Sequence, residues 1–328
     1  MELGFLVDST PGLWWVHTGI LHPGCSTSKT CLDERRVRVP LPELKRHRIV
    51  GFTDGLVILM DKRTTEIRVL HPFTRVVVNL PPLAPLYHEV IRQKSSLLDM
   101  NAAVCSSASS ATSIAVVVWF LYTNVVLGAD PNSDWEVLHG GLYVWSTLPF
   151  QGRLYATSLC SREILQLYPP PTQEPFLENS AVVGHVPYFA DRGYWDFLLV
   201  ESGGRMLLVI RHPAPGTNES DWFRLYEVDV NSHHCRLIWV NSLGDRTLFL
   251  SGDRCLSVSA RDLPTLSSNS IYFSLPHDPI VMHSLQTGLS EQLAESCKIH
   301  DRKDRIRPSV RPFTIVDHLM TYCHPREW

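Results

Sequence analysis

The sequence lacks paired cysteine motifs, phosphate-binding glycine loops and a hydrolase nucleophile elbow. Its eight cysteines are scattered through 328 residues without a CxxC pair, so a disulfide framework is not predicted. No GxGxxG, GxxxxGKS or GxSxG segment occurs. These absences argue against nucleotide binding through a glycine-rich loop and against serine-based hydrolysis.

Long hydrophobic runs are also absent. The longest, residues 114–129, is shorter than the roughly 20 apolar residues that a membrane helix needs, and Thr123-Asn124 interrupt it. We predict two buried strands there. The apolar run at residues 3–7 contains Gly4 and has no basic lead-in, which is too short for a secretory signal. We therefore expect no membrane contact and an intracellular location, in the cytoplasm or the nucleus.

Neither positive nor negative charge is in large excess. The formal net charge is -3, with 19% charged and 44% hydrophobic residues, a composition typical of globular proteins. Proteins that grip phosphate backbones usually carry a positive excess, so nucleic acid is not an expected partner. Residues 300–311 (HDRKDRIRPSVR) form the most basic segment. We interpret it as a solvated loop, with a docking surface for an acidic partner as the alternative.

The sequence is instead rich in short runs of β-branched and aromatic residues separated by Gly, Pro, Asn, Asp and Ser, a pattern typical of strands and turns. Two short helices are predicted, at residues 87–98 and 289–296. Ser202-Gly203-Gly204 predicts a hairpin turn, because adjacent glycines accept the positive φ of primed turns. The predicted strands lie at residues 48–60 (with Asp54-Gly55 within), 66–70, 75–80, 113–128, 142–145, 153–157, 164–168, 196–201, 205–211, 222–230, 236–240, 247–250, 255–259, 270–273 and 280–284.

These strands group into about six or seven units of roughly 40 residues, the spacing of propeller blades. The units begin near residues 12, 49, 113, 141, 180, 233 and 269. So many repeated meanders favour radial closure, which also limits exposed sheet edges. We predict an all-β fold: one β-propeller domain over residues 1–328, with few short helices and a divergent segment at residues 1–48.

Several segments resemble the β-propeller of the plant F-box-associated KIB-type family, a domain of unknown function. The resemblance covers roughly residues 10–320 and rests most on VGFTDGLVILMDKRTTEIRVLHPFTRVVVNLPPL (50–83), FLLVESGGRMLLVIR (197–211), FRLYEVDV (223–230) and WVNSLGDRTLFLSGDRCLSVSARDLPTLSSN (239–269). It implies a propeller that, in F-box proteins, selects the protein to be ubiquitinated. His71 and Arg75 depart from the pattern, which usually has Asn and Gly there.

Family members typically begin with an F-box, a helical module that docks on the Skp1 adaptor of a ubiquitin ligase. Residues 1–48 contain Trp14-Trp15 and four prolines but no amphipathic helix pair. We therefore expect the F-box, and with it Skp1 binding, to be missing. Within the matched segments, Pro72 and Thr74 are expected to shape a turn. Core positions between blades are predicted for four aromatic residues, Trp239, Phe249, Tyr272 and Phe273.

Candidate sites are sparse. A zinc site at His233, His234, Cys235 and Cys255 is not favoured, because adjacent residues of a strand point to opposite faces. A looser group, Cys25 and Cys31 with His17 and His22, is not favoured either. Asp191, Asp196, Asp221 and Asp229 lie near strand ends, and no pair is favoured by spacing. Trp195 and Trp222 lie near predicted loops, where a tryptophan can anchor an interface.

No catalytic, cofactor-binding or metal-binding residue is predicted, and the partner-binding residues stay unassigned. The preferred hypothesis is a non-enzymatic, protein-binding propeller that resembles the substrate-recognition half of an F-box protein, with a partner of unknown identity. Two alternatives stay open. One is an enzyme with a site in the propeller channel, and the other is a degenerate copy without a function.

Overall fold

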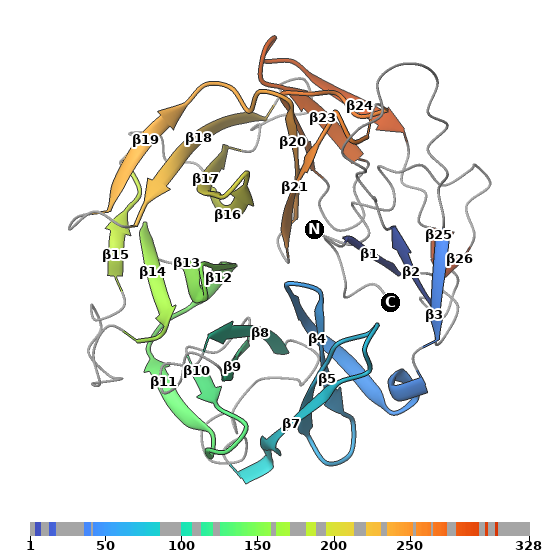
Figure 1. Cartoon of the computed structure of the whole chain (residues 1–328). Helices are drawn as coiled ribbons and strands as arrows, with labels where there is room; N and C mark the ends of the chain where they lie inside the picture. Colours follow the sequence, from blue (N-terminus) through green and yellow to red (C-terminus); the bar gives the residue numbers. More distant parts are fainter. Residues whose placement is uncertain are drawn as a thin grey trace, which may run out of the picture.

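The fold is a ring of β-sheets around a central axis, which Figure 1 shows end-on. The computed structural model describes residues 4–7, 13–17, 36–40, 42–85, 100–106, 113–120, 125–158, 162–170, 182–187, 195–212, 221–230, 235–251, 254–263, 265–273, 280–294, 299–300 and 306–307. Within this part of the chain, six sheets of three to five strands make up the ring, and a separate strand pair accompanies them. The all-β propeller prediction is confirmed.

Four of the sheets are meanders of four antiparallel strands, here called blades 1 to 4. Blade 1 consists of β4 (His47–Thr53), β5 (Leu56–Asp61), β6 (Glu66–Leu70) and β7 (Val77–Pro82). Blade 2 consists of β8 (Met100–Ser106), β9 (Ile114–Phe120), β10 (Val125–Ala129) and β11 (Glu136–Gly140). Blade 3 consists of β12 (Val144–Phe150), β13 (Arg153–Ser158), β14 (Glu163–Tyr168) and β15 (Val182–His185). Blade 4 consists of β16 (Asp196–Ser202), β17 (Arg205–His212), β18 (Trp222–Asp229) and β19 (Arg236–Val240).

Blade 5 departs from a simple meander. It has five strands in the order β21-β20-β22-β23-β24, in which β20 pairs with β22 in parallel and with β21 antiparallel. Its strands are β20 (Arg246–Leu250), β21 (Cys255–Ser259), β22 (Ser270–Phe273), β23 (Ile280–Ser284) and β24 (Ser290–Ala294). The remaining elements are β1 (Gly4–Val7), β2 (Leu13–His17) and β3 (Arg36–Pro40) in one sheet, the 3-10 helix η1 (Pro42–Lys45), and the pair β25 (Ile299–His300) and β26 (Ile306–Arg307).

The hydrophobic core lies between neighbouring blades rather than inside any one of them. One cluster joins blades 1 and 2, a second joins blades 2 and 3, and two more join blade 4 to blades 3 and 5. Blades 2, 3 and 4 therefore bury both faces, which explains why many of their strands read as continuous apolar runs instead of alternating ones. Residues 114–129 are the clearest case, and the two buried strands predicted there are β9 and β10.

Buried hydroxyl groups connect the innermost strands of neighbouring blades. Figure 1 shows β4, β8, β12, β16 and β21 nearest the central axis. A buried polar group without a hydrogen-bond partner is costly. Here each buried hydroxyl forms a hydrogen bond with a backbone N–H or with a second hydroxyl of the neighbouring blade. The contacts are Val104 N–H to Thr53 Oγ1 at 3.1 Å, Leu199 N–H to Ser146 Oγ at 3.1 Å, and Ser202 Oγ with Ser257 Oγ at 2.8 Å.

The turns predicted from their own residues were confirmed. Gly203 and Gly204 have φ of 62° and 77° and join β16 to β17 in an unbroken register. In the turn after β6, Arg75 has φ of 62°, which explains why the family pattern has glycine there. His71 Nδ1 accepts the Thr74 N–H at 3.2 Å, a bond that an asparagine side chain would also accept.

Three predictions were wrong. The helix predicted at residues 289–296 is absent from residues 289–294, because residues 290–294 form β24 and pair with β23; residues 295 and 296 lie outside the described residues. Residues 48–60 are two strands, since Asp54 and Gly55 make the turn between β4 and β5. Four of the seven predicted blade starts fall inside a blade. Residues 113, 180, 233 and 269 lie at β9, β15, β19 and β22. The reason is that the spacing of strands along the chain does not show which strand of a blade is innermost. The predicted helix at residues 87–98 lies outside the described residues.

Candidate functional site: an aromatic and arginine surface on blade 4

Three aromatic side chains meet at one end of blade 4. Trp195 immediately precedes β16, His212 ends β17, and Trp222 begins β18. His212 and Trp222 are register partners, and their rings stack with centroids 5.2 Å apart and planes at 20°. Trp195 makes edge contacts with both, at 4.6 Å to His212 and 5.1 Å to Trp222. Strand pairing thus brings together the two tryptophans that the sequence placed near loops.

An arginine extends this cluster toward the rim of the ring. Arg224 follows Trp222 by two residues on β18, so both side chains leave the same face of the strand. Its guanidinium carbon lies 4.8 Å from the Trp222 ring centroid and 5.9 Å from that of Trp239 on β19, within cation–π range. Trp239 also contacts Tyr226, its register partner, at 5.5 Å. We call Trp195, His212, Trp222, Arg224 and Trp239 the aromatic–arginine surface.

Exposure is greatest at the outer strand, β19. Trp239 is 57% exposed, and the adjacent Ile238 is 51% exposed. The prediction of a core position for Trp239 was therefore wrong, although Phe249, Tyr272 and Phe273 are buried as predicted. The reason is that β19 is the rim strand of blade 4 (Figure 1), where Leu237 packs against the core between blades 3 and 4 and Trp239 is not part of that core. Among the described residues, β19 pairs with β18 along one edge and with no strand along the other.

A buried ion network lies on the opposite face of the same strands. Arg211 on β17 has a side chain only 7% exposed, and it binds two carboxylates. Its Nη1 donates to Asp196 Oδ2 at 2.8 Å, and its Nε and Nη2 reach Asp221 Oδ2 at 2.7 and 2.6 Å. The guanidinium also lies 5.0 Å from the Phe273 ring of blade 5. The network ties the residues next to Trp195 and Trp222 to β17 and to the neighbouring blade.

Sequence reasoning found part of this site. It named Trp195, Trp222, Asp196 and Asp221, but it favoured no pairing among the aspartates and did not single out His212, Arg211 or Arg224. One signal was available, since Trp222, Arg224 and Tyr226 recur at every second position of a predicted strand and must share a face. Asp196 and Asp221 come together at Arg211 only through the register of three strands. The spacing of the two aspartates along the sequence does not predict this.

The other candidate groups do not form a site in the described part of the chain. Cys235 packs with the cluster between blades 3 and 4, whereas Cys255 packs with the cluster between blades 4 and 5. His233, His234, Asp191, His22, Cys25 and Cys31 lie outside the described residues, as does the side chain of His17. Among the residues that the structure describes, no three His, Cys, Asp or Glu side chains come close enough together to hold a metal ion.

Burial alters the ionisation of several groups, which are spread over the ring. Burial raises the pKa of the Cys105 thiol on β8 to about 12 and that of Cys255 on β21 to about 12. It lowers the pKa of His139 on β11 and of His283 on β23. Each shift keeps the group neutral near pH 7, because loss of hydration penalises the charged form. In the described ranges, no helix has the length and apolarity needed to cross a membrane.

Comparison with known proteins identifies a family by sequence. The model of the KIB1-4 beta-propeller family matches residues 27–301. No curated protein matches the chain in sequence.

Similar solved structures are remote. A luciferin-regenerating enzyme is 8% identical, with 90% of this chain and 83% of that chain covered and a TM-score of 0.38. Regucalcin, a calcium-binding protein from Agrobacterium tumefaciens, is 10% identical, with 85% and 80% covered and a TM-score of 0.32. A chain of a nidogen/laminin complex is 10% identical, with 88% and 90% covered and a TM-score of 0.39.

Proposed function

Because this chain belongs to the KIB1-4 beta-propeller family, we propose that it is a protein-binding propeller that engages its partner through the aromatic–arginine surface of blade 4. In this role it resembles the substrate-recognition half of a plant F-box protein. The proposed surface lies on the propeller itself, so binding there needs no adaptor such as Skp1. We place the protein inside the cell, in the cytoplasm or the nucleus, where the free thiols of Cys105, Cys235 and Cys255 would stay reduced.

The observation that carries the proposal is the exposed rim of blade 4. Trp239 and Ile238 each expose more than half of their surface, on opposite faces of β19, and Arg224 lies against the Trp239 ring. Tryptophan and arginine are enriched among the residues that contribute most to protein interfaces. A partner that covers this rim would remove apolar area from water, which is the main driving force of association.

Preorganisation supports the same surface. The aromatic rings of Trp195, His212 and Trp222 hold one another in place, and the Arg211 network anchors the strand ends from the opposite face. Side chains that are already ordered lose less conformational entropy when a partner binds. The surface therefore needs little rearrangement to serve as an interface.

The chemistry of the described residues supports binding over catalysis. The thiols and imidazoles with displaced pKa values lie on four different strands, Cys105 and His139 in blade 2 and Cys255 and His283 in blade 5, and burial holds them in their neutral forms. Catalytic sites instead gather titratable groups of matched pKa in one cleft. The apolar packing between blades 1 to 5 also weighs against a degenerate copy, since a sequence under no constraint would be expected to lose apolar residues from these interfaces.

The test compares two rim variants by affinity purification from the native tissue. Trp239→Ala removes the exposed ring of blade 4, and Leu289→Ala, with Leu289 69% exposed next to β24, is the matched control on blade 5. The partner retained by the wild-type protein is purified, and its Kd is measured against each variant. We expect Trp239→Ala to weaken binding by roughly thirtyfold or more, the effect of losing an interface hot spot of about 2 kcal/mol.

The control decides the outcome. Leu289→Ala should bind with nearly the wild-type Kd, and both variants should melt close to the wild-type temperature. Equal Kd values for the two variants would show that the partner binds elsewhere on the ring. Turnover of a substrate by the purified protein, abolished by substitution of a polar cluster in the channel, would favour the enzyme alternative.

A further inference from the structure

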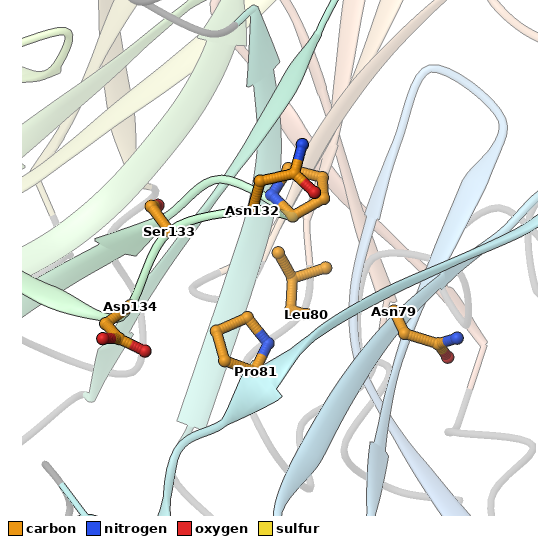
Figure 2. Close-up of a pocket in the computed structure, with 7 residues that line it drawn as sticks. Asn79, Leu80, Pro81, Asn132, Ser133 and Asp134 are labelled. Carbon is orange, nitrogen blue, oxygen red and sulfur yellow. The ribbon is translucent and has the colours of Figure 1, made fainter.

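An open pocket lies between blades 1 and 2, on different blades from the aromatic–arginine surface. Its volume is about 430 Å³. One wall is the strand β7 of blade 1, and the other is the turn between β10 and β11 of blade 2. Figure 2 shows Ser133 and Asp134 of the turn on one side and Asn79 of β7 on the other.

The two walls are fixed to each other. Trp135, which directly follows the turn, is 7% exposed, and its indole N–H donates to the Pro81 carbonyl oxygen at 2.8 Å. The turn itself is closed by Ser133, whose hydroxyl accepts the Asp130 N–H at 2.9 Å. The pocket is therefore built into the contact between two blades and is not a gap between independent loops.

The lining combines an apolar floor with a polar rim. Leu80 is 4% exposed and belongs to the core between blades 1 and 2, and Pro81 and Pro131 also line the pocket. Figure 2 shows Asn132 on the side of Leu80 away from Pro81. Asn132 and Asp134 are exposed, so their amide and carboxylate groups are available to a ligand at the rim.

The charge of the pocket has one sign. Of the described residues that line it, Asp134 is the charged one. The turn and its flanks carry two more carboxylates, Asp130 and Glu136, and residues 129–138 contain no Lys, Arg or His. Arg68 of β6 is the register partner of Asn79, so it shares the sheet face of Asn79 and not that of Leu80, and its guanidinium pairs with Glu66 at 3.3 Å.

We propose that this pocket binds a basic side chain, arginine or lysine, of a protein partner. The aliphatic stem of such a side chain packs on Leu80 and the proline rings, because long cationic side chains bury their stems on apolar surface and keep the charge at the rim. The cation then meets the Asp134 carboxylate and the Asn132 amide oxygen. A neutral or acidic side chain lacks this match. The inference goes beyond the proposed function, since it concerns other blades and a different chemistry.

The experiment uses the indole N–H of Trp135 as a reporter. The full chain is labelled with ¹⁵N at its tryptophan indoles, and the Trp135 peak is assigned by its loss in Trp135→Phe. The protein is titrated with acetyl-arginine methylamide and, as a neutral probe of the same shape, with acetyl-citrulline methylamide. Saturation transfer from protein to probe is recorded in parallel. This measurement does not depend on the assignment of the Trp135 peak, so it still reports binding if Trp135→Phe fails to fold.

We expect a saturable shift of the Trp135 peak, and saturation transfer to the probe's side-chain methylenes, with the arginine probe and not with the citrulline probe. Asp134→Asn should weaken binding by roughly two- to fivefold, the factor that one exposed ion pair supplies. Glu136→Gln, an equal charge change outside the lining, should leave the Kd within about 1.5-fold. Equal responses to the two probes, equal effects of the two variants, or no saturable response at all would overturn the proposal.

Discussion

Replacement of Arg211 by methionine is expected to destabilise the fold far more than the same replacement at Arg205 on the same strand. Arg211 is 7% exposed and binds Asp196 and Asp221 at 2.6 to 2.8 Å. Removing one partner of a buried ion pair leaves uncompensated charge and typically costs about 3 to 5 kcal/mol. Water reduces this cost here, because the side chains of Asp196 and Asp221 are 26% and 14% exposed. We therefore expect a loss of about 2 to 4 kcal/mol in the free energy of unfolding.

Arg205→Met is the matched control. Arg205 also lies on β17 and pairs with a glutamate of β18, Glu227, at 3.1 Å, but its side chain is 44% exposed. Exposed pairs contribute about 0.2 to 1 kcal/mol. With an unfolding entropy of about 2.1 cal/mol/K per residue, a chain of this length shifts its Tm by roughly 1.5 °C for each kcal/mol. Arg211→Met should thus lower the Tm by about 3 to 6 °C, and Arg205→Met by about 1.5 °C or less.

Calorimetry and urea unfolding measure both variants. A triple variant, Arg211→Met with Asp196→Asn and Asp221→Asn, separates the cause of the loss. It removes the stranded charges together with the arginine, so it should recover part of the stability lost in Arg211→Met. If Arg211→Met and Arg205→Met differ by less than about 1 kcal/mol, or if the triple variant recovers nothing, the network does not stabilise the strand ends as argued.

Two further predictions concern the fold. His139 is 2% exposed, its Nε2 lies 2.9 Å from the Leu167 carbonyl oxygen, and burial lowers its pKa. The unfolded chain therefore binds the proton of this histidine more readily than the folded protein does. The stability that the neutral imidazole contributes is present above about pH 6.5 and is lost as the pH falls through the folded pKa. The Tm drop between pH 7 and pH 5 should be smaller in His139→Gln than in wild type, and parallel curves would contradict this assignment. Arg75 has φ of 62° and pairs with Glu43 at 3.0 Å; since both variants lose that pair and only glycine relieves the backbone, chemical denaturation should find Arg75→Gly more stable than Arg75→Ala by about 1 kcal/mol. A stability order with alanine above glycine would show that the turn is not strained.

The parts of the fold that could be predicted from sequence are those that a few adjacent residues decide. Paired glycines at 203 and 204 determine a hairpin, because few other residues accept positive φ there. The turn at residues 71–75 shows how far such chemistry tolerates change. His71 supplies the acceptor that asparagine would supply, and Arg75 takes the left-handed backbone conformation of the glycine it replaces. The resemblance survives these substitutions because the turn keeps both of its physical requirements.

What could not be predicted depends on partners distant along the chain. Residues 289–296 suggested a helix, because Glu291, Gln292 and Glu295 have good helix propensity. Pairing with β23 overrides that propensity, as tertiary context commonly does. The order of blade 5 is a further case. Its innermost strand, β21, follows β20 in sequence, and β22 then pairs with β20 in parallel, which a count of evenly spaced strands cannot anticipate.

The error at Trp239 separates two kinds of position in this propeller. Inner strands carry hydroxyl bonds from blade to blade, and middle strands bury both faces, so substitutions there act first on stability. A rim strand such as β19 has one unpaired edge and exposed side chains, so substitutions there cost little stability and can change what is recognised. An aromatic residue is core by default only where a neighbouring blade covers it. On the rim, the same residue with an arginine beside it has the composition of an interface, and the partner-binding residues that we propose for this propeller are best sought there.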